Sequence, residues 1–515
     1  SVRVKEDLLA RAEHASRDGK AVLKSTSQMA TDRALIKSAI KLVETQEMAP
    51  ERAIWEAATS FADQMAALGG YMAERVTDIH DVRARIVAEL TGQQAPGIPV
   101  SDEPFILAAI DLAPADTATL DPEKVIALIT SDGGPQAHTA ILARGLGLPA
   151  IVAAKGVTEI ADGTIVYVDS NEGIVDTEPT DADREAAIKY ANRKPVADFD
   201  GQGVLADGTR VELYANVGDG KSAEKAASLK AEGVGLLRTE FGFLGHDSEP
   251  SIETQAKTYK SVFDAFPGKH IVVRTLDAGA DKPLPFLNVN PEENPALGVR
   301  GFRTDWTVPG VLTRQLQAIK AASEESDADI WVMAPMISTT SEARNFANML
   351  KEIGLPVHGV MVETPAAVMN AEAILGEVDF VSIGTNDLTQ YTMAADRLLG
   401  DLAHLNNPWQ PAVLKMIKMT VEGAQRASVT AGKKKYVSVC GEAAADPALA
   451  VVLIGLGVDT LSMNAGAIPA VAAVLKSVTK EKAQQIAAIA LQQISSAEAK
   501  ESARKALPIL DELGL

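Results

Sequence analysis

The sequence has 515 residues, of which 46% are hydrophobic and 23% charged, and its formal net charge is −20 at pH 7. This length allows roughly two to four domains, and a strong negative charge without a basic tract excludes nucleic acid as the expected partner. No apolar stretch has the length of a membrane span and no signal-peptide pattern opens the sequence, so we expect no membrane insertion. The single cysteine, Cys440, excludes an intramolecular disulfide and indicates a cytoplasmic protein.

The first part of the chain carries helical periodicity and almost no strand signal. Apolar residues recur at helical spacing, as at Ile54, Phe61 and Leu68. Glycine pairs and polar breaks separate the helical stretches. The pattern therefore predicts a helical bundle over residues 1–92.

Residues 93–178 differ in composition from the helical part. A linker containing glycine and proline opens the segment, and short apolar runs bounded by turn signals follow it. These runs are residues 105–109, 125–129, 150–152 and 164–168. They predict a small α/β domain, and residues 179–204 then form a helical, charged linker.

His138 lies in an unusual setting within this α/β segment. It follows the pair Gly133-Gly134 and begins a predicted short helix that Gly147 and Pro149 bring to an end. A histidine at a helix N-terminus faces free N–H groups and the positive end of the helix dipole, which favour an anion. Two interpretations fit these residues: the histidine carries a phosphoryl group, or it caps the helix or contacts a ligand.

From about residue 205 onward, short runs typical of buried strands alternate with helical stretches. The predicted strands are residues 211–215, 233–237, 270–273, 330–333, 358–362, 380–383, 436–439 and 460–463. An eightfold β/α alternation over about 300 residues is typical of a TIM barrel. We therefore expect residues 205–515 to form a (β/α)8 barrel, with a doubly wound open sheet as the alternative.

Polar and charged residues follow six of these predicted strands. They are Arg238, Thr239 and Glu240; Arg274, Thr275 and Asp277; Glu363, Thr364 and Pro365; Gly384 to Asp387; Cys440, Gly441 and Glu442; and Asn464. The C-terminal strand ends of a barrel open onto one face, where active sites form. Six coincident cases predict a functional site on that face.

The chemical types of these residues indicate an anion and a divalent cation. Arg238, Arg274 and, slightly further along the chain, Arg397 supply forked guanidinium donors suited to phosphate and carboxylate oxygens. Glu363 and Asp387 offer hard oxygen ligands with no cluster of cysteines or histidines nearby, which favours Mg²⁺ or Mn²⁺ over Zn²⁺.

Two further strand-end residues fit the same site. Asn386 can add a neutral contact to the anion. Cys440 can donate or accept a proton, although a small buried apolar side chain is the simpler interpretation of a lone cysteine.

The sequence resembles the phosphoenolpyruvate (PEP)-utilising enzymes, and most closely the enzyme I branch of the bacterial sugar phosphotransferase system. The resemblance is carried by residues 384–391 (GTNDLTQY) with Asp396-Arg397, 133–144 (GGPQAHTAILAR), 237–241 (LRTEF), 274–277 (RTLD), 281–285 (DKPLP), 292–300 (EENPALGVR) and 439–442 (VCGE). These segments are long, and they extend over nearly the whole chain.

The resemblance implies that the protein transfers the phosphoryl group of PEP to His138 and then to the phosphocarrier protein HPr, releasing pyruvate. The implied roles are ring positioning for Thr117; metal binding for Glu363 and Asp387; PEP binding for Arg238, Arg274, Asn386 and Arg397, with Lys282 and Arg300; and protonation of the enolate carbon for Cys440. It further implies HPr docking on the helical domain and homodimerisation through the barrel. Because one histidine cannot reach both the barrel and a carrier protein without movement, we expect the 93–178 domain to swivel on its linkers.

The sequence departs from the family pattern in two places. Family members usually begin with a further segment that includes a strand of the histidine domain. Residues 135–137 (PQA) replace the basic and hydroxyl side chains that are common before the histidine. Since the histidine and its downstream segment are intact, we expect altered tuning with retained activity.

Three alternatives are open. A PEP synthase or pyruvate dikinase would need a large ATP-binding domain, for which residues 1–92 are too short and too helical. A nitrogen-branch enzyme I would carry an additional sensory domain, for which the sequence shows no segment. A non-catalytic regulator that binds PEP or HPr would be favoured by loss of the histidine, a metal ligand or the acid, yet His138, Glu363, Asp387 and Cys440 are present.

Overall fold

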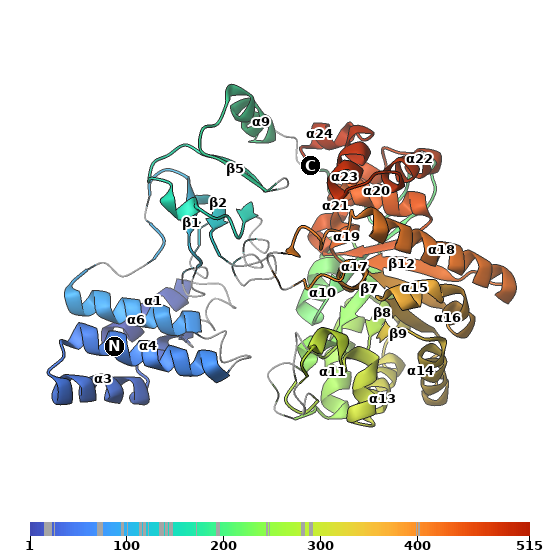
Figure 1. The fold of residues 1–515 in the computed structure, drawn as a ribbon. Coiled ribbons are helices and arrows are strands. Elements are labelled where there is room, and N and C mark those ends of the chain that lie inside the picture. The colour runs from blue at the N-terminus through green and yellow to red at the C-terminus, as the bar shows by residue number, and fades with distance from the viewer. Residues whose placement is uncertain are drawn as a thin grey trace. The chain divides into compact units, whose positions relative to one another are not determined.

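The protein is described here by a computed structural model that divides into two compact units, Ser1–Ile188 and Lys189–Leu515 (Figure 1). The structure describes residues 1–14, 23–24, 26–68, 76–93, 97–99, 101–112, 116, 120–121, 123–132, 139, 143, 148–170, 173–191, 196–243, 246, 248–279, 284–287, 292–397, 399 and 402–515. No helix in this part of the chain is long and apolar enough to cross a bilayer.

The first unit begins with helices. They are α1 (Val2–His14), α3 (Arg33–Gln46), α4 (Pro50–Leu68) and α6 (Val76–Thr91). Asp32 caps α3, because its side chain accepts from the backbone N–H groups of Ala34 and Leu35. The apolar faces of these helices share one buried cluster that includes Leu8, Leu35 and Val82, as the helical periodicity predicts.

The second part of this unit contains two small sheets. Strands β1 (Phe105–Ala109), β2 (Val125–Thr130) and β3 (Ala150–Ile151) form a parallel sheet in that order, and β4 (Tyr167–Asp169) pairs antiparallel with β5 (Ile174–Asp176). The short helix η1 (Val157–Glu159) lies between β3 and β4, and α9 (Asp181–Ala191), which buries no residue, follows β5. The buried cluster here includes Leu107 and Leu128 and shares no residue with the cluster of the helices.

The second unit is built on a closed barrel of eight parallel strands, green to orange-red in Figure 1. The strands are β6 (Glu212–Val217), β7 (Gly233–Arg238), β8 (His270–Arg274), β9 (Asp329–Ile337), β10 (His358–Val362), β11 (Phe380–Gly384), β12 (Tyr436–Cys440) and β13 (Thr460–Met463). All five residues of β10 and of β11 are buried, as expected for parallel strands covered on both faces.

Helices cover and extend this barrel. They are α10 (Gly220–Ser228), η2 (Thr239–Gly242), α11 (Ile252–Phe263), η3 (Pro295–Leu297), η4 (Gly301–Arg303), α12 (Thr304–Thr307), α13 (Val311–Glu324), α14 (Thr340–Ile353), α15 (Pro365–Met369), α16 (Ala371–Glu377), α17 (Thr385–Met393), α18 (Pro411–Ala431), α19 (Glu442–Ala445), α20 (Pro447–Leu456), η6 (Ala465–Ala467), α21 (Ile468–Leu475), α22 (Lys480–Leu491), α23 (Ser496–Lys505) and α24 (Ile509–Leu513). One large apolar cluster joins the strands to these helices, α22 to α24 included. The predicted fold class, a helical part, a small α/β part and a C-terminal (β/α)8 barrel, is confirmed.

Candidate active site

The predicted functional side chains lie at the C-terminal ends of the barrel strands. Arg238 and Arg274 are the last residues of β7 and β8 and stand opposite each other in the register of that pair. Glu363 directly follows β10, Asp387 lies in the first turn of α17, and Cys440 ends β12. Because neighbouring strands are parallel, these ends open onto one face of the barrel.

Two carboxylates hold Arg274 in place. Its Nη2 pairs with Oε1 of Glu240, and its Nη1 lies 3.1 Å from Oδ2 of Asp277. The backbone carbonyl of Arg274 accepts from Oγ1 of Thr239 at 2.9 Å, and that hydroxyl accepts from Nε2 of Gln315 at 3.0 Å. The guanidinium is therefore oriented before any substrate arrives, which lowers the reorganisation needed to bind an anion.

Arg300 and Arg397 converge on Asp387. Arg300 donates to Oδ1 at 2.9 Å and Arg397 donates to Oδ2 at 3.1 Å. Arg300 also lies 3.3 Å from Oδ2 of Asp277, so that three arginines and three carboxylates alternate along one row. Gln390 fixes the backbone next to this row, since its Oε1 accepts from the N–H of Arg397 at 2.9 Å.

Glu363 is buried and tightly enclosed. Its Oε2 accepts at 2.9 Å from the N–H of Met336, a non-glycine residue at φ 58° near a register shift between β9 and β10. Such bulges and strained residues are frequent at functional sites. A Cβ on Gly384 would come within 2.4 Å of Oε1, so only glycine fits beside this carboxyl. Burial, reinforced by the charges of Asp387 and Asp277, raises the pKa of Glu363 well above its ordinary value.

Arg238 differs from the other arginines of the site. Within the described part of the chain no carboxylate lies at ion-pair distance from it, and burial together with the charge of Arg274 lowers the pKa of Arg238. Arg238 is half-buried, and Glu240 and Glu442 attract it from beyond ion-pair distance. An anion can therefore approach this guanidinium without displacing a paired carboxylate. Asn386, half-buried in the first turn of α17, lies directly before Asp387.

Cys440 lies buried at the end of β12. Its Sγ donates to the carbonyl of Ile383 at 3.6 Å. Burial raises the pKa of the Cys440 thiol, so the group stays protonated at neutral pH. It therefore retains a proton that can be donated at this face of the barrel.

Three predicted site residues, His138, Thr117 and Lys282, lie outside the described residues. The structure does describe their neighbours in sequence. Oγ1 of Thr139 donates to Oδ1 of Asp111 at 2.9 Å, and Oδ1 of Asp116 pairs with Nη2 of Arg85 at 2.5 Å.

Sequence reasoning placed Glu240 and Asp277 at strand ends but gave them no role, although they orient two of the arginines. Gln390 was also not singled out. The position of Glu240, two residues after Arg238 at the end of the same strand, indicates that it lies in the site. The sequence does not indicate its partner, which is Arg274 of the next strand.

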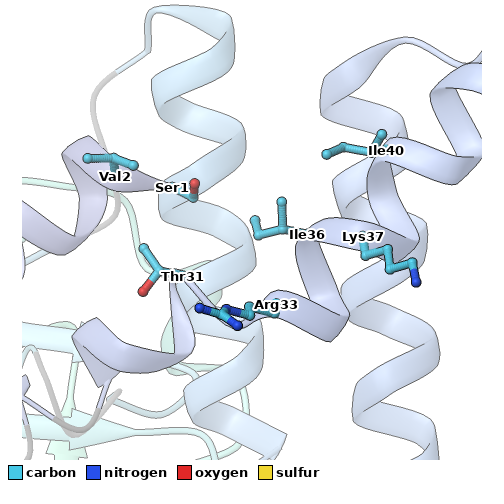
Figure 2. Close-up of a pocket in the computed structure, with 7 residues that line it drawn as sticks. All are labelled: Ser1, Val2, Thr31, Arg33, Ile36, Lys37 and Ile40. Carbon is cyan, nitrogen blue, oxygen red and sulfur yellow. The ribbon is translucent and has the colours of Figure 1, made fainter.

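The helical part of the first unit has an open hollow between α1 and α3. Figure 2 shows Ser1 and Val2 on one side of it and Ile36, Lys37 and Ile40 on the other. Apolar Val2, Ile36 and Ile40 line it together with Arg33 and Lys37. The described residues that line this hollow include no carboxylate, histidine or thiol, so we do not assign the phosphoryl chemistry to it.

Family models of the PEP-utilising enzymes match three consecutive parts of the chain. The N-terminal model matches residues 2–75, the mobile-domain model residues 101–173, and the PEP-binding-domain model residues 196–480. The chain is also similar to a solved structure described as the NMR solution structure of Enzyme I (nEIt), with 30% identity and a TM-score of 0.31, over 35% of this chain and 74% of that one.

Two relatives match over most of their length. A phosphoenolpyruvate-protein phosphotransferase of Streptomyces coelicolor is 45% identical over 508 residues, which are 98% of this chain and 90% of that protein. One of Haloferax volcanii is 39% identical over 466 residues, 88% of this chain and 81% of that protein. The chain therefore belongs to the PEP-utilising enzymes and, among them, to the phosphoenolpyruvate-protein phosphotransferases.

Proposed function

We propose that the protein transfers the phosphoryl group of PEP to His138 and then to the phosphocarrier protein HPr, releasing pyruvate. The observation that supports this most strongly is the barrel face. It carries oriented arginines, Arg238 with no ion pair among the described residues, two candidate metal ligands and a protonated thiol. A trianionic substrate that must leave as an enolate and be protonated needs each of these groups.

The arginines of the barrel face are the main proposed PEP-binding residues. Arg238 has no ion pair among the described residues, so it is the first candidate for the phosphate or carboxylate of PEP. Arg274, Arg300 and Arg397 are held by carboxylates at defined positions, and Asn386 and Lys282 complete the proposed set. Orienting the substrate in this way supplies most of what phosphoryl transfer requires of a protein.

Glu363 and Asp387 are the proposed metal ligands. No group of three or more His, Cys, Asp or Glu that could hold a metal occurs among the described residues. Binding of Mg²⁺ by one or two carboxylates, with oxygens of substrate and water as further ligands, is usual in proteins. The raised pKa of Glu363 fits this role, because a cation would offset the two causes of the rise, burial and the repulsion from Asp387. When bound, Mg²⁺ or Mn²⁺ would neutralise charge on the phosphate.

The bond changes assign His138 and Cys440 complementary tasks. A ring nitrogen of His138 attacks phosphorus, the bond from phosphorus to the enol oxygen breaks, and that oxygen keeps the electron pair. The terminal carbon of the enolate then takes the proton of the Cys440 thiol, and pyruvate leaves. Solvent returns a proton to the thiolate.

The division of labour follows the chain. Residues 1–92 would dock HPr, residues 93–178 would carry the phosphohistidine, and residues 205–515 would bind PEP and form a homodimer. The linkers near 91–97 and 179–204 would act as hinges as the histidine domain moves between its two stations. Thr117 would position the imidazole ring, and the protein would act in the cytoplasm.

The test is incubation with PEP labelled in its phosphate and Mg²⁺, without ATP, of the parent and the His138→Ala variant. We expect acid-labile, base-stable label on the parent, none on the variant, and loss of the label when HPr is added. No label on a folded parent would contradict the proposal and favour a regulator that only binds PEP. A requirement for ATP would favour a dikinase-like enzyme.

A further inference from the structure

A buried ion pair joins the helices of the first unit to its α/β part. Nη2 of Arg85, on α6, lies 2.5 Å from Oδ1 of Asp116, and its Nε lies 2.9 Å from Oδ2 of Asp81, one helical turn earlier. The side chains of Arg85 and Asp116 are only 1% and 10% exposed. Fully buried arginines are rare unless they are paired, so the pair is a specific feature of this junction.

The pair crosses the boundary of a domain that the family model describes as mobile. Asp116 lies inside the matched range, residues 101–173, and α6 lies outside it. The buried apolar clusters on the two sides share no residue. Each side therefore keeps its own core if they separate, whereas separation must break the contact between Arg85 and Asp116.

An ion pair is well suited to a contact that has to open. The cost of taking charges out of water can exceed their attraction, and here burial and the neighbouring Asp81 raise the pKa of Asp116 even though Arg85 and Arg11 act in the opposite direction. When the two sides separate, water solvates both charged groups again. The pair can therefore specify one orientation without making it permanent.

The part of the chain that contains Asp116 also contacts the residue next to His138. Asp116 directly precedes Thr117, and Asp111, near the other end of the segment, accepts from Oγ1 of Thr139 at 2.9 Å. Thr139 directly follows His138 and is buried. Asp111 thus contacts the residue beside the histidine, and Asp116, five positions later in the sequence, contacts α6.

We propose that Arg85 and Asp116 form a latch that holds the mobile domain in the orientation presenting His138 to HPr, and that the latch opens before His138 reaches PEP. Arg85 is then a positioning residue for the second transfer and has no part in the first. This inference rests on the proposed function, since it assumes two stations for one histidine.

The kinetic test uses the full chain with Arg85→Met or Asp116→Asn, and Glu89→Gln as the matched control. Glu89 lies on the same helix and makes an exposed ion pair with Arg3 at 2.6 Å. One rate is the formation of phosphohistidine from PEP and Mg²⁺ without HPr. The other is the loss of label after phosphorylated enzyme is mixed with HPr.

We expect both latch variants to be phosphorylated by PEP at least as fast as the parent and to pass the label to HPr about tenfold more slowly, because fewer molecules hold the histidine in the receiving orientation. The control should keep the parent's rates. Equal slowing of both steps, slowing of the PEP step alone, or unchanged transfer to HPr would each overturn the latch.

A second measurement does not depend on catalysis. Spin labels on Glu44→Cys of α3 and Lys155→Cys of the α/β part report the distance between the two sides, and the native Cys440 is buried and does not interfere. The distance distribution should be narrow in the parent and broad in both latch variants; the same narrow distribution in variant and parent overturns the proposal. Asp116→Asn keeps the size and hydrogen-bonding capacity of the side chain, so it serves if Arg85→Met unfolds. A parent that takes no label from PEP would count against the proposed function, and this distance measurement would still decide the latch.

Discussion

Replacing Asp277 with asparagine tests whether the row of ion pairs prepares the barrel face for its substrate. Asp277 stands between Arg274 at 3.1 Å and Arg300 at 3.3 Å, and all three side chains are nearly inaccessible to water. The asparagine side chain would be isosteric with the carboxylate but uncharged. Each arginine keeps one other carboxylate, Glu240 or Asp387, so neither cation is left alone.

The size of the effect follows from that arrangement. Removing the only partner of a buried charge costs about 3–5 kcal/mol, whereas weakening one of two charge-assisted hydrogen bonds costs about 1.5–3 kcal/mol. If the loss falls on the transition state, kcat for phosphorylation by PEP should fall about 10- to 150-fold, since about 1.4 kcal/mol corresponds to a factor of ten. The KM for PEP should change little or decrease, because the site becomes more positive.

Rapid-quench measurement of phosphohistidine over a range of PEP concentrations separates kcat from KM. The matched control is Asp264→Asn, which removes an exposed pair with Lys260 on α11, 2.8 Å long in the parent, and should change neither constant. A kcat for Asp277→Asn within a factor of two of the parent's, in a protein of unchanged melting temperature, would refute the idea that Asp277 orients the arginines. A large rise in KM with unchanged kcat would show instead that the row serves only binding.

Three further substitutions probe other parts of the barrel. Gly384→Ala should lower kcat about a hundredfold, because the new Cβ would lie 2.4 Å from Oε1 of Glu363 and displacement of a functional group by about 1 Å has effects of that size. The control is Gly376→Ala, where a Cβ meets nothing within 4 Å. Equal kcat values for the two variants would contradict the expectation. Cys440→Ala should slow pyruvate formation at least about a hundredfold and make protonation of stereospecifically labelled PEP random, whereas retained stereochemistry would exclude the thiol as donor. Asp379→Asn should lower the melting temperature at pH 7, because hydrogen bonds from His358 and Lys433 outweigh the effect of burial and hold the pKa of Asp379 below its ordinary value. This stabilisation is present above about pH 4, the pKa of an unfolded Asp, and is lost as the pH falls further. The melting temperatures of parent and variant should therefore converge in acid, and a difference that stays constant with pH would refute the account.

The strands of the barrel could be predicted from sequence because each is a short, mainly apolar run, and polar or charged residues follow six of the eight. Their C-terminal ends predicted the face that carries the site, since parallel strands in a barrel share one direction. β9 runs from Asp329 to Ile337, well past the predicted end at residue 333. The bulge near Met336 lies in this extension, and a bulge breaks the alternation on which sequence reading depends.

The pairing within the site could not be predicted in the same way. Glu240 and Arg274 are 34 residues apart, and Arg300 and Asp387 are 87 apart. Which arginine meets which carboxylate depends on strand register and on the loops that follow each strand, and neither is expressed in local residue patterns. The restriction on Gly384 has the same origin, because it arises from the carboxyl of Glu363, which directly follows the neighbouring strand β10.

Ion pairs between arginine and carboxylate occur at both places where this protein is proposed to act, and their surroundings assign them different tasks. In the barrel, the paired residues extend from elements that share one apolar core, so opening a pair there would require the core to deform; such pairs keep their geometry while substrate binds and leaves. Arg85 and Asp116 belong to two parts with separate cores, so the pair can open while both parts stay folded. Removing a barrel carboxylate should therefore change the rate of the chemical step, whereas removing a partner of the latch should change how often the histidine faces its acceptor.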